Sequence, residues 1–248
     1  MRLCFDGGLN IAAYSGAANG LLRGQNVTPT EYAGSAAGAI IAGALACGAT
    51  REFIKQELTV DITPLCLPGV MAGFNCQNYM GSRSGDSFTK WYARVIHKLT
   101  GCADITLQNI HEIYGGRLII AGTNISAREN VYFDYIDYPE LSLILAVRIS
   151  MGLPFIFSPV QMGGCMWINN FASFPNDEDT IRFTTTGCVN DFWSLYGAIA
   201  EMNMEAAIKI PTTDAYQAGL EIAEGLNVVE PESQFRSSPP MDIPMRIF

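Results

Sequence analysis

The chain has 248 residues, of which 49% are hydrophobic and 16% are charged, and its formal net charge is −9. Such a chain can bury one large α/β core, and its surplus of apolar residues could also supply a surface for lipid or a partner. The acidic balance argues against an interface with nucleic acid or with anionic membranes, because both need clustered Lys and Arg.

The seven cysteines are scattered and form no C-x-x-C pair, so they do not support a zinc or redox motif. We interpret them as free thiols in a reducing compartment, which favours the cytoplasm. Leu3 to Phe5 is followed at once by Asp6-Gly7-Gly8, and without a longer apolar run we expect no signal peptide. The longest apolar run, which starts at Ala36 and passes Cys47, is about fourteen residues. We therefore expect a buried helix there and no transmembrane segment.

The first third of the chain alternates between strand patterns and helix patterns. Strands are expected over residues 2–5 and 28–33, and helices over residues 10–22, 36–46 and 51–58. Residues 61–83 contain prolines, glycines and cysteines without a clear period, and we interpret them as a loop or lid.

The alternation continues through the rest of the chain. A helix running to Leu99 is expected to begin at Asp86 or Ser87, either of which can act as its N-cap. Strands are expected over residues 117–122 and 131–135, and helices over residues 141–151, 194–208 and 214–226. This order predicts a mostly parallel sheet with helices on both faces. We expect a single domain over residues 1–230, followed by a Pro-rich tail over residues 231–248 that lies extended on the surface or reaches a neighbouring subunit.

The most informative segment is the run Tyr-Ala-Gly-Ser-Ala-Ala-Gly-Ala-Ile from Tyr32 to Ile40. A strand, a turn flanked by Gly34 and Gly38, and an apolar helix are together typical of a nucleophile elbow. The glycines are needed because the turn is tight and the helix must approach the sheet closely. A serine in this turn would stand at a helix N-terminus, where amides and the helix dipole favour developing negative charge.

The segment from Gly34 to Ile40 resembles the signature G-[TS]-S-A-G-A-I of patatin-like phospholipases, with Ala36 in place of the central serine, between Ser35 and Ala37. Three more blocks resemble this family in the same order. They are Asp6-Gly7-Gly8, Ser84-Gly85-Asp86 with Phe88 and Trp91, and the run from Ala146 to Val160. The resemblance covers residues 1–178 and implies a three-layer α/β/α fold. The pattern Met-x-x-Pro-Phe-x-Phe from Met151 to Phe157 most resembles that of patatin-like proteins of large DNA viruses.

Patatin-like enzymes use a Ser–Asp dyad, and the resemblance places Ala36 and Asn169 at its two positions. A methyl group cannot attack a carbonyl, and an amide cannot act as a general base near neutral pH. The family's oxyanion loop, G-G-G-x-[RK]-G, is also altered, because Gly7 and Gly8 remain while the basic residue and the last glycine are lost. Asp6 is expected to place a negative charge close to where an oxyanion would form.

Ala36 alone is compatible with a laboratory substitution or with natural loss of the serine. Asn169, Asn170 and Ile11 are further departures from the family pattern, and natural loss explains all of them together. Ser35 offers a hydroxyl next to Ala36, but without a base we expect it to be inert. Asp177 could be a displaced base, although a solvated acidic loop is the better interpretation.

Other candidate residues have structural interpretations. His97 and His111 fit no acid–Ser–His order. Asp134 and Asp137 have no further ligand at suitable spacing, so a turn is favoured over a metal site. Asp6 also disfavours a phosphate at Gly7-Gly8. We expect neither a metal nor a cofactor.

The sequence thus predicts a lipid acyl hydrolase fold that has lost catalysis, retained as a structural, assembly or interaction protein in a homo-oligomer or larger assembly. Two alternatives stay open. The chain could bind a lipid or fatty acid in the old acyl groove, or it could be an active phospholipase A or esterase whose serine has been replaced by Ala36. A cytoplasmic location is expected, or a virus particle if the chain is viral.

Overall fold

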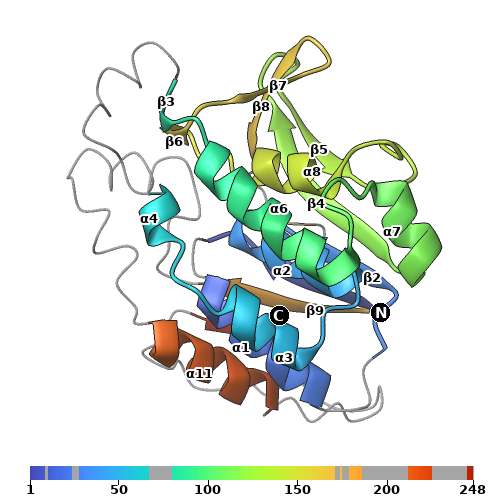
Figure 1. Cartoon of the computed structure of the whole chain (residues 1–248), viewed down its shortest axis with the longest axis vertical. Coiled ribbons are helices and arrows are strands. Elements are labelled where there is room, and N and C mark those ends of the chain that lie inside the picture. Colours follow the sequence, from blue (N-terminus) through green and yellow to red (C-terminus); the bar gives the residue numbers. More distant parts are fainter. Residues whose placement is uncertain are drawn as a thin grey trace.

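The computed structural model describes residues 1–8, 11–23, 28–66, 80–170, 174, 179–185, 212–224 and 245–247. In this part of the chain, strands and helices alternate much as the sequence predicts (Figure 1). The helix expected over residues 194–208 lies outside the described residues, as do most of the expected lid region and most of the expected tail.

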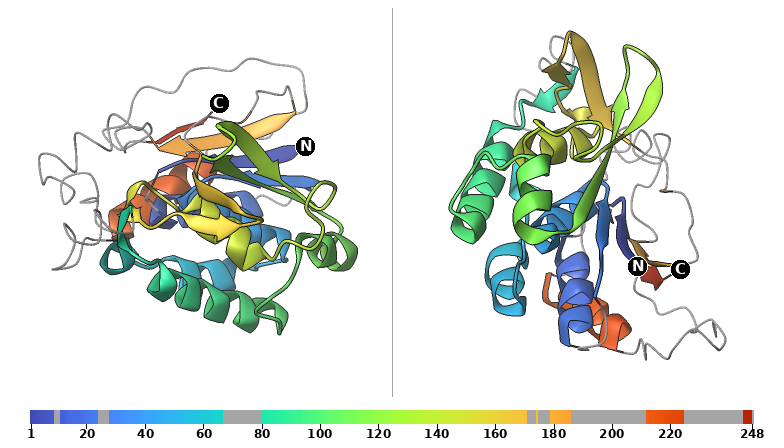
Figure 2. Two further views of the ribbon diagram at one scale, coloured as in Figure 1. Left: turned by 90° about the horizontal axis from the view of Figure 1, so that it is seen from above. Right: turned by 90° about the vertical axis from the view of Figure 1, so that its right-hand side faces the viewer.

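An eight-stranded sheet forms the centre of the molecule. Its strands are hydrogen-bonded along the path β10-β9-β1-β2-β4-β8-β7, and β5 also pairs with β4. Its parallel strands are β9 (Thr180–Thr185), β1 (Arg2–Asp6), β2 (Glu31–Gly34) and β4 (Arg117–Asn124). The other four strands each pair antiparallel with their neighbours, and they are β5 (Glu129–Phe133), β7 (Val160–Met162), β8 (Cys165–Asn169) and β10 (Met245–Ile247). β10 lies within the stretch expected to be a tail, and it pairs with β9, which in turn separates it from the N-terminal strand β1 (Figure 2).

The register of β4 brings the ends of two other strands together. Ile120 pairs with Gly34 of β2 and with Phe133 of β5, so β2 and β5 lie on opposite edges of β4. Gly122 pairs with β5 and with Asn169 of β8, so β8 shares its edge of β4 with β2. Because β8 runs antiparallel to β4, the carboxyl ends of β2 and β8 meet there.

The described helices pack on one face of this sheet (Figure 2). They are α1 (Ile11–Arg23), α2 (Ala37–Ala46), α3 (Arg51–Phe53) with the π-helical turn Ile54–Leu58, α4 (Thr63–Cys66), α6 (Asp86–Thr100), α7 (Leu107–Tyr114), α8 (Leu143–Ser150) and α11 (Thr212–Glu224). Their apolar side chains form one core with Leu3 and Phe5 of β1 and with Leu118 and Ile120 of β4. The opposite face carries a smaller buried cluster made of Cys4, Ala33, Ile119, Ala121 and Phe174.

Helix α11 packs against α1 at very short range, although the two are far apart in the sequence. A Cβ atom at Gly16 would lie 2.0 Å from the Tyr216 carbonyl oxygen, and one at Gly219 would lie 2.0 Å from the Ala13 carbonyl oxygen. Glycine therefore allows the two backbones to touch. The Asn19 side chain donates to the Tyr216 hydroxyl at 3.0 Å across this contact.

The start of α6 differs from the prediction. Asp86 and Ser87 are its first residues, and the N-cap is Gly85 with φ 86°, without a side-chain cap. The positive φ favours glycine, and a Cβ at Gly85 would lie 2.2 Å from Arg148 Nε, so a larger residue would have to displace this guanidinium. Arg148 Nη2 donates to the carbonyls of Ser84 and Ser158 and so ties the start of α6 to the segment after β6 (Phe155–Phe157). β6 itself pairs with β3 (Gly81–Arg83) in a small separate sheet.

Candidate active site

The turn between β2 and α2 has the backbone of a nucleophile elbow. Ala36 has φ 50° and ψ −124°, a conformation that costs a residue with a side chain about 1–3 kcal/mol. The flanking glycines are sterically required, since a Cβ at Gly34 would lie 2.5 Å from the Gly38 carbonyl oxygen and one at Gly38 would lie 2.0 Å from the Phe5 carbonyl oxygen. The helix thus approaches the sheet as closely as the glycines in the sequence indicate.

Asn169 lies beside this turn because the ends of β2 and β8 meet there. Its side-chain amide donates to the Ser150 carbonyl oxygen, and its backbone N–H donates to the Gly152 carbonyl oxygen at 3.0 Å. The Ser150 hydroxyl in turn accepts the Ala36 N–H at 3.0 Å. Ala36, Ser150 and Asn169 are all buried, so the last turn of α8 joins the two positions. Ser150 lies in the run from Ala146 to Val160, but no sequence pattern marked it as a site residue.

The backbone amides at the start of α2 all have partners within the protein. Ala37 N–H donates to the Gly8 carbonyl at 3.3 Å, Gly38 N–H to the Ser35 carbonyl at 2.9 Å, and Ala39 N–H to the Ala36 carbonyl at 3.0 Å. In nucleophile elbows, the amide of the residue after the nucleophile helps to form the oxyanion hole. Here that amide is Ala37 N–H, and the loop that contains Gly7 and Gly8 occupies it.

Asp6, at the start of this loop, directs its carboxylate to the opposite face of the sheet. Its Oδ2 lies 3.3 Å from Arg182 Nη1 of β9, and the Cys4 thiol donates to its Oδ1 at 3.5 Å. Burial raises the pKa of Asp6, while Arg182 opposes that rise. The sequence led us to expect a negative charge from Asp6 close to where an oxyanion would form. In the structure this carboxylate pairs with Arg182, which offsets its charge.

Comparison with known proteins identifies this arrangement. A family model described as patatin-like phospholipase matches residues 3–169, which is more than half of the chain. The chain belongs to the patatin-like phospholipase family. The resemblance read from four sequence blocks is therefore confirmed.

Individual relatives of this patatin-like chain are distant. An uncharacterised protein of Acanthamoeba polyphaga mimivirus is 27% identical over 135 residues, which cover 54% of this chain and 44% of the relative. VipD from Legionella pneumophila superposes with a TM-score of 0.57 and 17% identity, covering 83% of this chain and 53% of VipD. The type III effector protein ExoU matches with a TM-score of 0.47 and 14% identity, covering 90% of this chain and 52% of ExoU. The chain thus spans about half the length of the proteins it matches. The likeness to VipD shows the three-layer α/β/α fold expected from the sequence, of which the described residues supply the sheet and the helical layer on one of its faces.

The hydroxyl of Ser35, the residue before Ala36 in the patatin-like elbow, is held in a hydrogen bond. Ser35 Oγ donates to the Asn170 carbonyl oxygen at 3.0 Å, and the side chain is buried. The inertness of Ser35 stays a prediction. Asp177, the possible displaced base, lies outside the described residues.

The remaining candidates have structural contacts. The His111 ring stacks on Tyr135 with centroids 3.8 Å apart. Asp134 accepts the backbone N–H groups of Ile136 and Asp137 and also pairs with Arg117, as a turn residue does. Within the described ranges, no three His, Cys, Asp or Glu residues gather as a metal site, and no helix is long and apolar enough to cross a membrane.

Proposed function

We propose that this patatin-like protein does not hydrolyse lipid esters and that its fold serves binding or assembly. The observation that carries the proposal is the hydrogen bond from Ala37 N–H to the Gly8 carbonyl, together with Ala36 and Asn169 at the dyad positions. The elbow backbone is present, while the three groups that acyl transfer requires are each missing or occupied.

These three defects remove different groups from the same step, the attack on the ester carbonyl. Ala36 supplies no nucleophile. Asn169 supplies no base, and a general base contributes about 10²–10⁴ in rate. Loss of one oxyanion-hole donor costs about another 10²–10³. Because the defects lie at three separate places in the chain, restoring any one of them leaves the others in place.

A role in binding or assembly explains why the fold is kept. The core and the elbow glycines remain well packed although the chemistry is missing. We therefore propose that the surface of the molecule is its functional part, in a homo-oligomer or a larger assembly. Lipid binding in an acyl groove stays a prediction, as do the cytoplasm and the virus particle as locations.

Steady-state hydrolysis tests the proposal directly. The unmodified chain, Ala36→Ser, Asn169→Asp and the double variant are each assayed on p-nitrophenyl esters and on phosphatidylcholine vesicles. We expect the unmodified chain and both single variants to match the uncatalysed rate. Hydrolysis by the unmodified chain above the uncatalysed rate would contradict the proposal. The substitution Ser35→Ala would then show whether Ser35 is the nucleophile.

The positive half of the proposal needs a separate measurement. Sedimentation of the unmodified chain over a wide concentration range is expected to show self-association. A monomer at every concentration would argue against a homo-oligomer. Native mass spectrometry of the same sample would detect a retained acyl lipid, and finding one would favour the lipid-binding alternative over assembly.

A further inference from the structure

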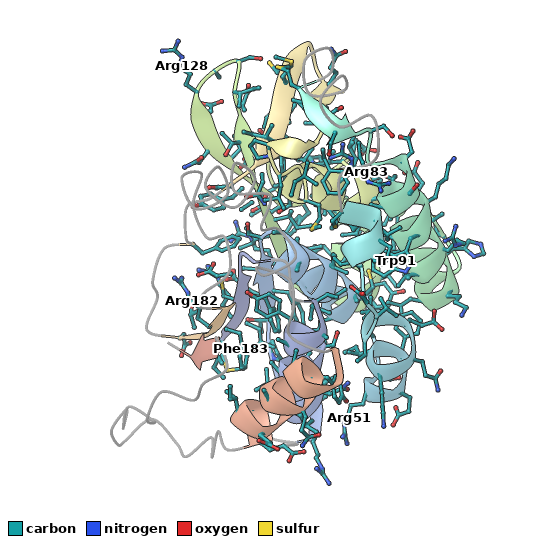
Figure 3. The ribbon with its side chains drawn as sticks, turned by 90° about the vertical axis from the view of Figure 1, so that its left-hand side faces the viewer. Arg51, Arg83, Trp91, Arg128, Arg182 and Phe183 are labelled. Carbon is teal, nitrogen blue, oxygen red and sulfur yellow. The ribbon has the colours of Figure 1, made fainter. Side chains whose placement is uncertain are left out.

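A buried ion pair lies at the carboxyl end of β1, directly before the loop that occupies the Ala37 amide. Arg182 Nη1 and Asp6 Oδ2 are 3.3 Å apart, with side chains only 7% and 10% exposed. Arg182 and Phe183 are neighbours on β9 and point to opposite faces of the sheet (Figure 3). Phe183 stacks on Phe5 in the main core, with ring centroids 5.4 Å apart.

One residue, Phe174, connects this pair to the segment that follows Asn169. Arg182 Nη2 donates to the Phe174 carbonyl oxygen at 2.7 Å, and the Phe174 backbone N–H bonds to the Asp6 carboxylate. Phe174 is itself buried in the cluster with Cys4. The pair therefore joins three segments: the end of β1, β9, and the chain beyond β8.

The loop after Asp6 is also held from the helical side. The Tyr14 hydroxyl of α1 lies within hydrogen-bonding distance of the Asp6 and Gly7 carbonyl oxygens, at 2.9 Å from the latter. Gly7 and Gly8 have φ of 52° and 75°, which glycine adopts at little cost. Two adjacent glycines could take other conformations, so side-chain contacts on both sides must select the one in which the Gly8 carbonyl faces Ala37.

We propose that Asp6 and Arg182 on one side, and Tyr14 on the other, are positioning residues that together hold this loop with the Gly8 carbonyl on the Ala37 amide. This deepens the proposed function, because the occupied amide is one of its three supports. On this view the pair acts on the site through backbone placement and touches no substrate. A purely stabilising ion pair would instead leave the Ala37 amide as protected as its neighbours when both charges are removed.

Amide hydrogen exchange, followed by NMR on the full chain labelled with ¹⁵N-alanine, tests this inference. The readout is the exchange rate of Ala37 divided by that of Ala39, whose amide bonds within the elbow itself. In Asp6→Asn/Arg182→Met this ratio is expected to rise by about tenfold or more. The matched control is Arg2→Met/Glu31→Gln, which removes the 2.7 Å ion pair between β1 and β2 at the other end of β1 and should leave the ratio unchanged.

Tyr14→Phe provides a second variant in case the first does not fold. It removes one hydroxyl from a side chain of nearly the same shape, and it is also expected to raise the exchange ratio. An unchanged ratio in either folded variant, or an equal rise in the control, would overturn the inference. These exchange rates do not depend on catalysis, so hydrolysis by the unmodified chain would contradict the proposed function while leaving this inference standing.

Discussion

Replacing Ala36 with glycine should cost much less stability than replacing Ala39 with glycine three residues later. Both alanines are buried, at 2% and 0% exposure, so each change removes a methyl contribution of about 0.8 kcal/mol. Each also adds the chain entropy of glycine, about 0.5–1 kcal/mol. Only Ala36→Gly relieves the strain at φ 50° and ψ −124°, which amounts to about 1–3 kcal/mol.

The shared losses cancel in the difference between the two variants, which leaves the strain. We therefore expect Ala36→Gly to be nearly neutral and about 2 kcal/mol more stable than Ala39→Gly. For a chain of this length, that corresponds to a difference in Tm of about 4–8 °C. Urea unfolding followed by circular dichroism measures both free energies. If the two variants lose the same stability, the elbow is not strained and the description of the turn is wrong.

Three further substitutions or measurements probe the rest of the structure. Gly16→Ala should lower stability by about 1–3 kcal/mol although alanine is the better helix former, because the new methyl would meet the Tyr216 carbonyl of α11; a stabilised variant would show that the helices are not in contact. Burial raises the pKa of Asp6 in the folded state, so the contribution of Asp6 to stability should fall as the pH rises from the ordinary aspartate pKa to the raised one. Urea unfolding of Asp6→Asn at a series of pH values should lack this decline. An identical pH profile in the variant would refute the raised pKa. Burial raises the pKa of Cys47 and of Cys66 to about 12, so iodoacetamide mapping at mildly alkaline pH should label exposed Cys102 at least about tenfold faster than either, and equal rates would contradict the burial.

The elbow could be recognised from the sequence because its determinants are local. Gly34 and Gly38 are within five residues of each other, and each is required by a contact inside the strand–turn–helix unit or with the adjacent strand. Asn169 could be placed only through family resemblance. The structure supplies the physical reason for its position, which is that β2 and β8 share one edge of β4.

The contacts that occupy the site could not be predicted, because they join distant segments. Nothing in the sequence around Asp6 indicates that Arg182 neutralises it, or that the Gly8 carbonyl turns toward Ala37. The contact of α11 with α1 likewise depends on the matching surfaces of two helices that are far apart in the sequence. The small residues at Gly16 and Gly219 signal a close approach, but they do not identify the partner helix.

We propose that the elbow is folded but holds no activated nucleophile, and reaction with a fluorophosphonate tests this proposal most directly. Such a probe forms a stable covalent bond only with an activated serine or similar nucleophile. Intact-mass spectrometry of the unmodified chain after prolonged incubation should show no adduct, both for the native protein and for protein unfolded before incubation. An adduct that forms on the native chain and is absent from the unfolded one would contradict the account, and peptide mapping would then identify the nucleophile.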